Sequence, residues 1–87
     1  MVTVQTHVSY EAIGDHKDEL EAREMLKKKY NVDFKVVQWD GPGGGNPVCE
    51  ISGEHQNVRE CLIEWYAGGN QKMGEDQFKH GMRLQVA

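Results

Sequence analysis

The sequence has no long apolar run, few cysteines and prolines, and an excess of acidic over basic residues. Without an apolar run long enough to cross a bilayer, or a charged segment followed by an apolar one, we expect no membrane span and a cytoplasmic location. The two cysteines, Cys49 and Cys61, are too few for a disulfide framework, so we expect both to be reduced. The net charge of −4 argues against a basic nucleic-acid-binding face.

No arrangement typical of a catalytic or metal site stands out in the chain. The histidines do not pair with one another or with a cysteine at metal-ligand spacing, so we expect no metal and no cofactor. The two serines lie outside any nucleophile motif, and no carboxylate pair stands out as an acid and a base. The sequence therefore predicts a protein that is not an enzyme. The histidines and serines weighed for a metal or catalytic site are His7, His16, His55, His80, Ser9 and Ser52.

The length of 87 residues predicts one domain spanning residues 1–87. Alternating apolar residues predict a first strand over residues 2–8. A helix is expected over residues 15–29, with Asp15 as N-cap, Asp18 completing a variant of the capping box, and Asn31 as a left-handed stop. Two strands follow, over residues 33–39 and 47–52, rich in β-forming side chains. We expect these two strands to pair antiparallel.

The helix with the clearest pattern is expected over residues 55–67. Its apolar residues Val58, Cys61, Leu62 and Trp65 recur at helical spacing, and Gly68 with the next glycine should end it. Residues 75–80 then predict one or two helical turns closed by Gly81, and the alternation in residues 82–86 predicts a last strand. The resulting order, β-α-β-β-α-β, predicts an α+β fold of ferredoxin-like topology, with one antiparallel sheet and two helices on one face. The residues expected to supply much of its core are Val2, Val4, Val8, Leu26, Phe34, Val36, Ile51, Val58, Leu62, Trp65 and Leu84.

A glycine-rich segment between the second and third strands is the main functional candidate. Glycines permit close backbone approach, and consecutive free N–H groups can bind an anion. No P-loop lysine follows, and a strand rather than a helix comes next, so neither nucleotide-binding motif is present. Two interpretations stay open: a hairpin tip, which we favour, or a surface that contacts a ligand or partner. The candidate contact residues are Trp39, Asp40, Gly43, Gly44, Gly45 and Asn46.

Aromatic residues supply a second argument about binding. Trp39, beside the glycine-rich segment, is either an anchor for a partner or a cover for the end of the core. RNA recognition by this type of fold uses aromatics on the first and third strands, and this chain has none there. Val37 and Trp39 share a side of the second strand and predict an apolar patch on the uncovered sheet face, a common cue for a partner or a homodimer.

The stretch from Gly43 to Gly53, followed by Val58, Leu62, Trp65 and Tyr66, resembles small bacteriophage proteins of ferredoxin-like or ACT-like type. The resemblance covers roughly residues 39–69 and supplies no catalytic residue. It implies a phage-type accessory protein. Together with the residues, it leads us to expect a non-enzymatic protein that engages another protein, such as a host factor it inhibits, through the sheet face and the glycine-rich segment. The alternative is a domain that binds a small anionic ligand or nucleotide in that segment.

Overall fold

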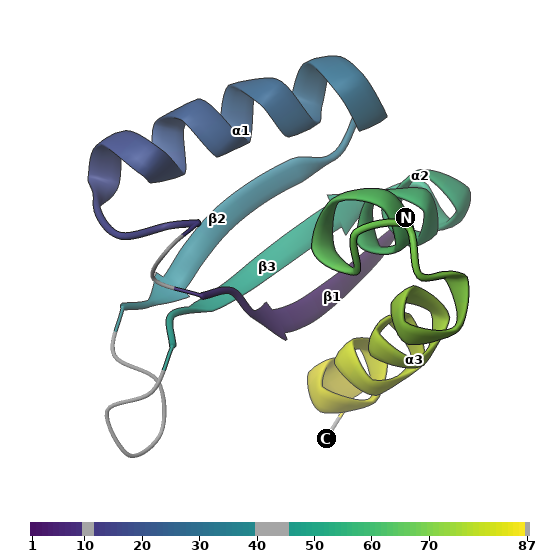
Figure 1. Ribbon diagram of the computed structural model, residues 1–87. Coiled ribbons are helices and arrows are strands. Elements are labelled where there is room, and N and C mark those ends of the chain that lie inside the picture. The colour runs from purple at the N-terminus through teal and green to yellow at the C-terminus, as the bar shows by residue number, and fades with distance from the viewer. Residues whose placement is uncertain (10–11, 40–45, 87) are drawn as a thin grey trace.

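A computed structural model describes residues 1–9, 12–39 and 46–86 of the chain, as an α+β domain. None of the helices in these ranges is both long and apolar enough to span a membrane. The elements, in chain order, are β1 (Val2–His7), α1 (His16–Tyr30), β2 (Asp33–Gln38), β3 (Val48–Gly53), α2 (His55–Cys61), the π-helical turn η2 (Leu62–Tyr66) and α3 (Gln71–Val86) (Figure 1).

The strands form one antiparallel sheet in the order β1-β3-β2. The predicted pairing of the second and third strands is confirmed, with Phe34 opposite Ile51 and Ile51 opposite Val4. All three of these side chains are buried, since this row faces the helices. The neighbouring row, Lys35, Glu50 and Gln5, falls on the other face because side chains alternate along a strand.

Helix α1 begins and ends as its sequence predicts. Asp15 is the N-cap, and its side chain accepts a hydrogen bond from the Asp18 N–H at 2.9 Å. Asp18 in turn accepts one from the Gly14 N–H at 2.9 Å, one residue before the N-cap, so the return bond differs from that of a standard capping box. Asn31 ends the helix in the left-handed region, with φ at 56°. These local contacts determine where the helix begins and ends.

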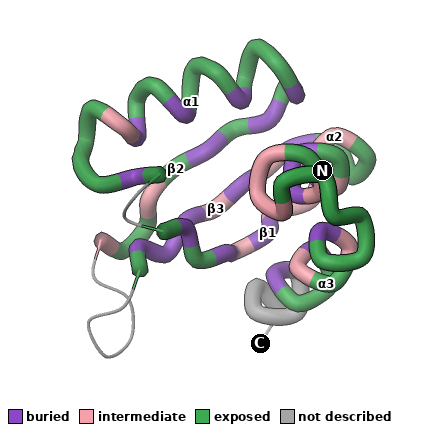
Figure 2. Tube along the Cα trace, in the orientation of Figure 1, coloured by how far each residue is buried: buried purple, intermediate pink, exposed green. Residues whose placement is uncertain are grey.

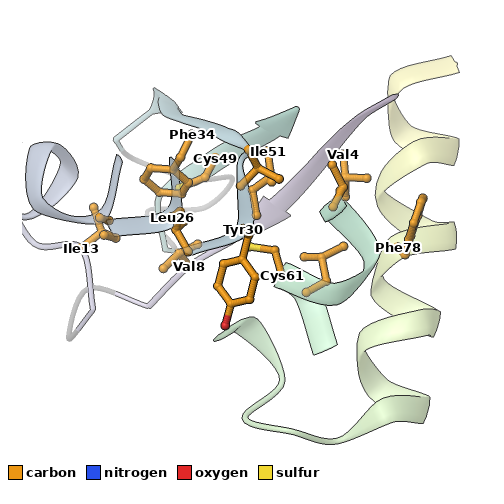
Figure 3. Close-up of a cluster of buried hydrophobic side chains, with 14 residues drawn as sticks. Val4, Val8, Ile13, Leu26, Tyr30, Phe34, Cys49, Ile51, Cys61 and Phe78 are labelled. Carbon is orange, nitrogen blue, oxygen red and sulfur yellow. The ribbon is translucent and has the colours of Figure 1, made fainter. Parts of the chain in front are cut away.

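A hydrophobic core lies between the sheet and the helices. In Figure 2 the buried residues of α1 lie along the side that faces the sheet. Ile13 lies at one end of the buried cluster and Phe78 of α3 at the other (Figure 3). Seven residues expected in the core are buried, and three more pack against it while partly exposed. The buried ones are Val4, Val8, Leu26, Phe34, Ile51, Val58 and Leu62, and the partly exposed ones are Val2, Val36 and Trp65.

The predicted last strand is wrong. Residues 82–86 continue α3, which runs unbroken from Gln71 to Val86. The described part of the sheet therefore has three strands, and the four-stranded ferredoxin-like arrangement is not confirmed. The prediction treated Gly81 as a helix stop. In the structure Gly81 is instead a point where α3 packs closely on β1, because a Cβ there would lie 2.6 Å from the Gln5 carbonyl oxygen.

Both edges of the sheet are covered. Helix α3 lies beside β1 (Figure 1). At the other edge, Glu19 of α1 accepts a hydrogen bond from the Val36 N–H at 2.7 Å, and Arg23 donates one to the Phe34 carbonyl at 3.0 Å. Glu19 and Arg23 also pair with each other at 3.2 Å. Side chains of α1 thus satisfy backbone groups of β2 that would otherwise invite a further strand.

Candidate functional site

The candidate residues of the glycine-rich segment fall at the edge of what the structure describes. Asp40, Gly43, Gly44 and Gly45 lie outside the described residues. Asn46 is described and exposed, directly before β3. It lines a cavity at that end of the sheet, and this cavity, next to the end of the glycine-rich segment, is the candidate binding site.

This first cavity has a volume of about 340 Å³. It is formed where the end of β1 and the residues after it meet η2. Such a volume lies near the lower limit for pockets that hold small molecules, and it also suits one large side chain of a partner. Its lining residues are His7, Val8, Ser9, Ala12, Asn46, Trp65 and Tyr66.

The two aromatic residues of the cavity come from the π-helical turn η2. The Ala67 N–H donates to the Leu62 carbonyl, five residues earlier, at 2.8 Å. This wider turn orients Trp65 and Tyr66 differently from a continued α-helix, and such turns are frequent at functional sites. Gly68 and the glycine after it then end the segment with positive φ angles, as predicted.

Trp65 is held in place while part of its ring remains accessible. Its ring contacts that of Phe34 edge to face, with centroids 5.7 Å apart. The residue packs against the core cluster and is partly buried. An aromatic side chain that the core already holds in place loses little conformational entropy when a partner covers its exposed part. This property suits a binding anchor.

The chemistry of the first cavity favours an uncharged aromatic group. None of the described residues that line it is Asp, Glu, Lys or Arg. His7, Ser9 and Asn46 supply hydrogen-bonding groups, while Trp65 and Tyr66 supply ring surface. Since no cationic side chain lines the described cavity, the expected anion site would depend on the backbone of residues outside the described ranges.

A second cavity adjoins the first on the other side of Trp65. Its volume is about 300 Å³. It lies between α1 and Trp65 and shares Ala12 and Trp65 with the first cavity. Its remaining lining is apolar except for two acidic residues of α1. The full lining is Ala12, Ile13, Asp18, Glu21, Ala22, Met25 and Trp65. We call the two cavities together the Trp65 groove.

The uncovered face of the sheet is polar, and its polar groups pair with one another. Lys35 lies 3.5 Å from Glu50, and the hydroxyls of Thr3 and Ser52 are 3.0 Å apart. Val37 is 42% exposed there, but it lacks the second apolar residue that the sequence predicted beside it. The expected apolar patch on this face is therefore wrong.

Trp39 is the residue missing from that patch. The register between β2 and β3 shifts between Val36 and Gln38, so β2 carries one extra residue there. A bulge of this kind reverses the side to which the following residues point. Trp39 consequently packs against the core cluster, and its ring meets that of His16 at 4.8 Å. Trp39 thus covers the end of the core while staying partly exposed, and its role as an anchor for a partner remains a prediction.

The thiols are buried in the core. Cys49 and Cys61 are free cysteines with 0% exposure. Burial raises the pKa of each thiol to about 12, with a further increase from Glu19 for Cys49 and from Glu64 for Cys61. Neither thiol is placed to act as a nucleophile. Within the described ranges, no group of three or more His, Cys, Asp or Glu residues is arranged to hold a metal ion.

Comparison with known proteins adds no relative: no family model, no curated protein and no solved structure matches this chain. The sequence pointed to Asn46, but it placed Trp65 on the apolar side of its helix, and it weighed His7 and Ser9 only as metal-binding or catalytic residues and not as parts of a binding surface. The adjacent pair Trp65 and Tyr66, directly before two glycines, was the available signal.

Proposed function

We propose that this chain is a non-enzymatic binding protein that engages a protein partner through the Trp65 groove. The observation that carries the proposal is the first cavity, where Trp65 and Tyr66 meet the hydrogen-bonding groups of His7, Ser9 and Asn46. Buried aromatic anchors surrounded by polar groups are typical of protein-binding hot spots. The sheet face expected to bind contributes less, since its polar groups already pair with one another.

A phage-type accessory protein that inhibits a host factor is the most concrete form of this proposal. It rests on the resemblance of residues 39–69 to small phage proteins and on the modest size of the chain. Self-association is a further form. Because both edges of the sheet are covered, a homodimer would use the uncovered sheet face or the groove, and light scattering after size exclusion would measure it.

A small ligand is the second candidate function, and the volume of the first cavity favours it. A space of about 340 Å³ holds a compact ring system. The ligand would be an uncharged aromatic molecule rather than the anion expected from the sequence, because no cationic side chain lines the described cavity.

A photo-crosslinking experiment tests the leading proposal. A benzoylphenylalanine placed at Asn46, on the cavity wall, should form adducts with a protein in cell extract, and excess N-acetyl-tyrosinamide should suppress them. The same group at Lys72, on α3 outside the groove, is the matched control. Equal adducts at both positions would refute the proposal. A small molecule retained in native mass spectra, with no suppressible protein adduct, would replace it with the second candidate.

A further inference from the structure

The second cavity differs from the first in charge, and this difference has a consequence for the partner. Asp18 and Glu21 lie one helical turn apart on α1, and both line the second cavity. Among the described residues, no Lys or Arg lines either cavity. The described lining thus passes from an uncharged aromatic compartment to an acidic one.

The floor of the second cavity suits a long aliphatic side chain. Ala22, Met25 and Trp65 supply apolar surface there, and Met25 is 40% exposed. Lysine and arginine place their methylene groups along such a surface while the charged end stays near water or a carboxylate. A guanidinium group also stacks on aromatic rings, which Trp65 offers.

We propose that the Trp65 groove recognises one segment of a partner protein that carries an aromatic residue beside a basic residue. The inference rests on the proposed function and adds the chemistry of the partner. The aromatic side chain fills the first cavity, against Trp65 and Tyr66. The basic side chain lies along the second cavity and reaches Asp18 and Glu21. Because the cavities share Ala12 and Trp65, side chains close together in one segment fill both.

Three features carry this assignment over other occupants. Charge complementarity selects a basic group, since the two charged residues in the described lining of the groove, Asp18 and Glu21, are both acidic. The net charge of −4 favours approach of such a group from a distance. The apolar floor separates this site from a simple acidic surface, because it contributes contact area that a small metal cation would not use.

The test follows the Trp65 indole N–H signal by NMR as small probes are added to the intact chain. The other indole signal belongs to Trp39 and is assigned with Trp39→Phe. N-acetyl-tyrosinamide, N-acetyl-argininamide and the acidic control N-acetyl-glutamic acid amide are titrated one by one. Peptides then join tyrosine and arginine through an increasing number of alanines. Both single probes should shift the Trp65 signal, the acidic probe should not, and the best joined peptide should bind at least about tenfold more tightly than either.

Substitutions assign each probe to its cavity. Glu21→Gln should weaken argininamide binding about two- to fivefold and leave tyrosinamide unchanged, as expected for a partly exposed ion pair. Asn46→Ala should do the reverse. Glu24→Gln, at an exposed acid of α1 outside both linings, is the matched control and should change neither. Asp18 is left intact because it accepts a hydrogen bond from the Gly14 N–H at the start of α1.

The outcomes distinguish a failure of this inference about the partner from a failure of the proposed function itself. If tyrosinamide binds and argininamide does not, or if Glu21→Gln leaves argininamide binding unchanged, the basic residue is wrong while the proposed function stands. If both probes bind but no joined peptide binds more tightly, the single segment is wrong. If neither probe moves the Trp65 signal, both the inference and the proposed function fail.

Discussion

Replacing Glu19 with alanine should open the β2 edge and destabilise the domain. The Glu19 carboxylate accepts a hydrogen bond from the Val36 N–H at 2.7 Å and one from Arg23 at 3.2 Å. Losing a hydrogen bond to a charged group costs about 1.5–3 kcal/mol, and losing the helical ion pair adds about 0.3–0.5 kcal/mol. The higher helix propensity of alanine returns a few tenths of a kcal/mol. We therefore expect a loss of about 2 kcal/mol in the free energy of unfolding.

Urea unfolding followed by tryptophan fluorescence measures this loss. For a domain of this size, about 2 kcal/mol corresponds to a Tm lower by about 8–16 °C. Glu24→Ala, at an exposed position of the same helix, is the control and should change the free energy by less than about 0.5 kcal/mol. Glu19→Ala should also self-associate at high concentration, because an uncovered edge can pair with another chain. If the two variants are equally stable and equally monomeric, the edge argument is wrong.

Three further predictions concern the core and α3. Thr6 is fully buried, and its hydroxyl has no hydrogen-bond partner among the described residues, so Thr6→Val should raise the free energy of unfolding by about 1 kcal/mol. A lower value would show that the hydroxyl is bonded. Gly81→Ala should lower it by about 1–3 kcal/mol, since the new Cβ would lie 2.6 Å from the Gln5 carbonyl oxygen, whereas Lys79→Ala on the exposed side of α3 should not. Burial raises the pKa of both Cys49 and Cys61 from the ordinary thiol value of 9.0 to about 12, so between these pH values the unfolded chain loses thiol protons that the folded chain keeps. Stability should therefore fall by about 1.4 kcal/mol per pH unit for each thiol above pH ~9, and Cys49→Ala with Cys61→Ala should flatten that alkaline slope. An unchanged slope would contradict the assigned burial.

Local chemistry made much of the fold predictable. The cap at Asp15, the stop at Asn31 and the alternation in β1 act within a few residues, so the sequence carries their signals directly. The register shift at Val37 carries no such signal, because it depends on how β2 and β3 pair. That one shift moved Trp39 from the expected open face to the core.

The end of the chain shows a conflict between local pattern and tertiary packing. Alternation in residues 82–86 fits a strand, and Gly81 fits a helix stop. In the structure the absence of a side chain at Gly81 lets α3 approach the backbone of β1, and the helix continues to Val86. A glycine that ends one helix and a glycine that permits close packing of another are alike in sequence. Which of the two roles a glycine has depends on the surface of the fold against which its helix packs.

The candidate site, like the fold, was predictable only where its signals are local in the sequence. Asn46 follows from the position of the glycine-rich segment, whereas the contribution of Trp65 depends on the π-helical turn and on the distant end of β1. Helical spacing placed Trp65 on the apolar side of its helix. It could not show that the ring also forms the wall between two cavities.

An amide NMR titration with N-acetyl-tyrosinamide tests the central claim most directly, because it shows where on the molecule an aromatic group binds. The account predicts that the largest shifts occur at Ser9, Asn46 and Trp65, around the first cavity. Shifts confined to Lys35 and Glu50, on the uncovered sheet face, would contradict it. They would return the binding surface to the face that the sequence first suggested.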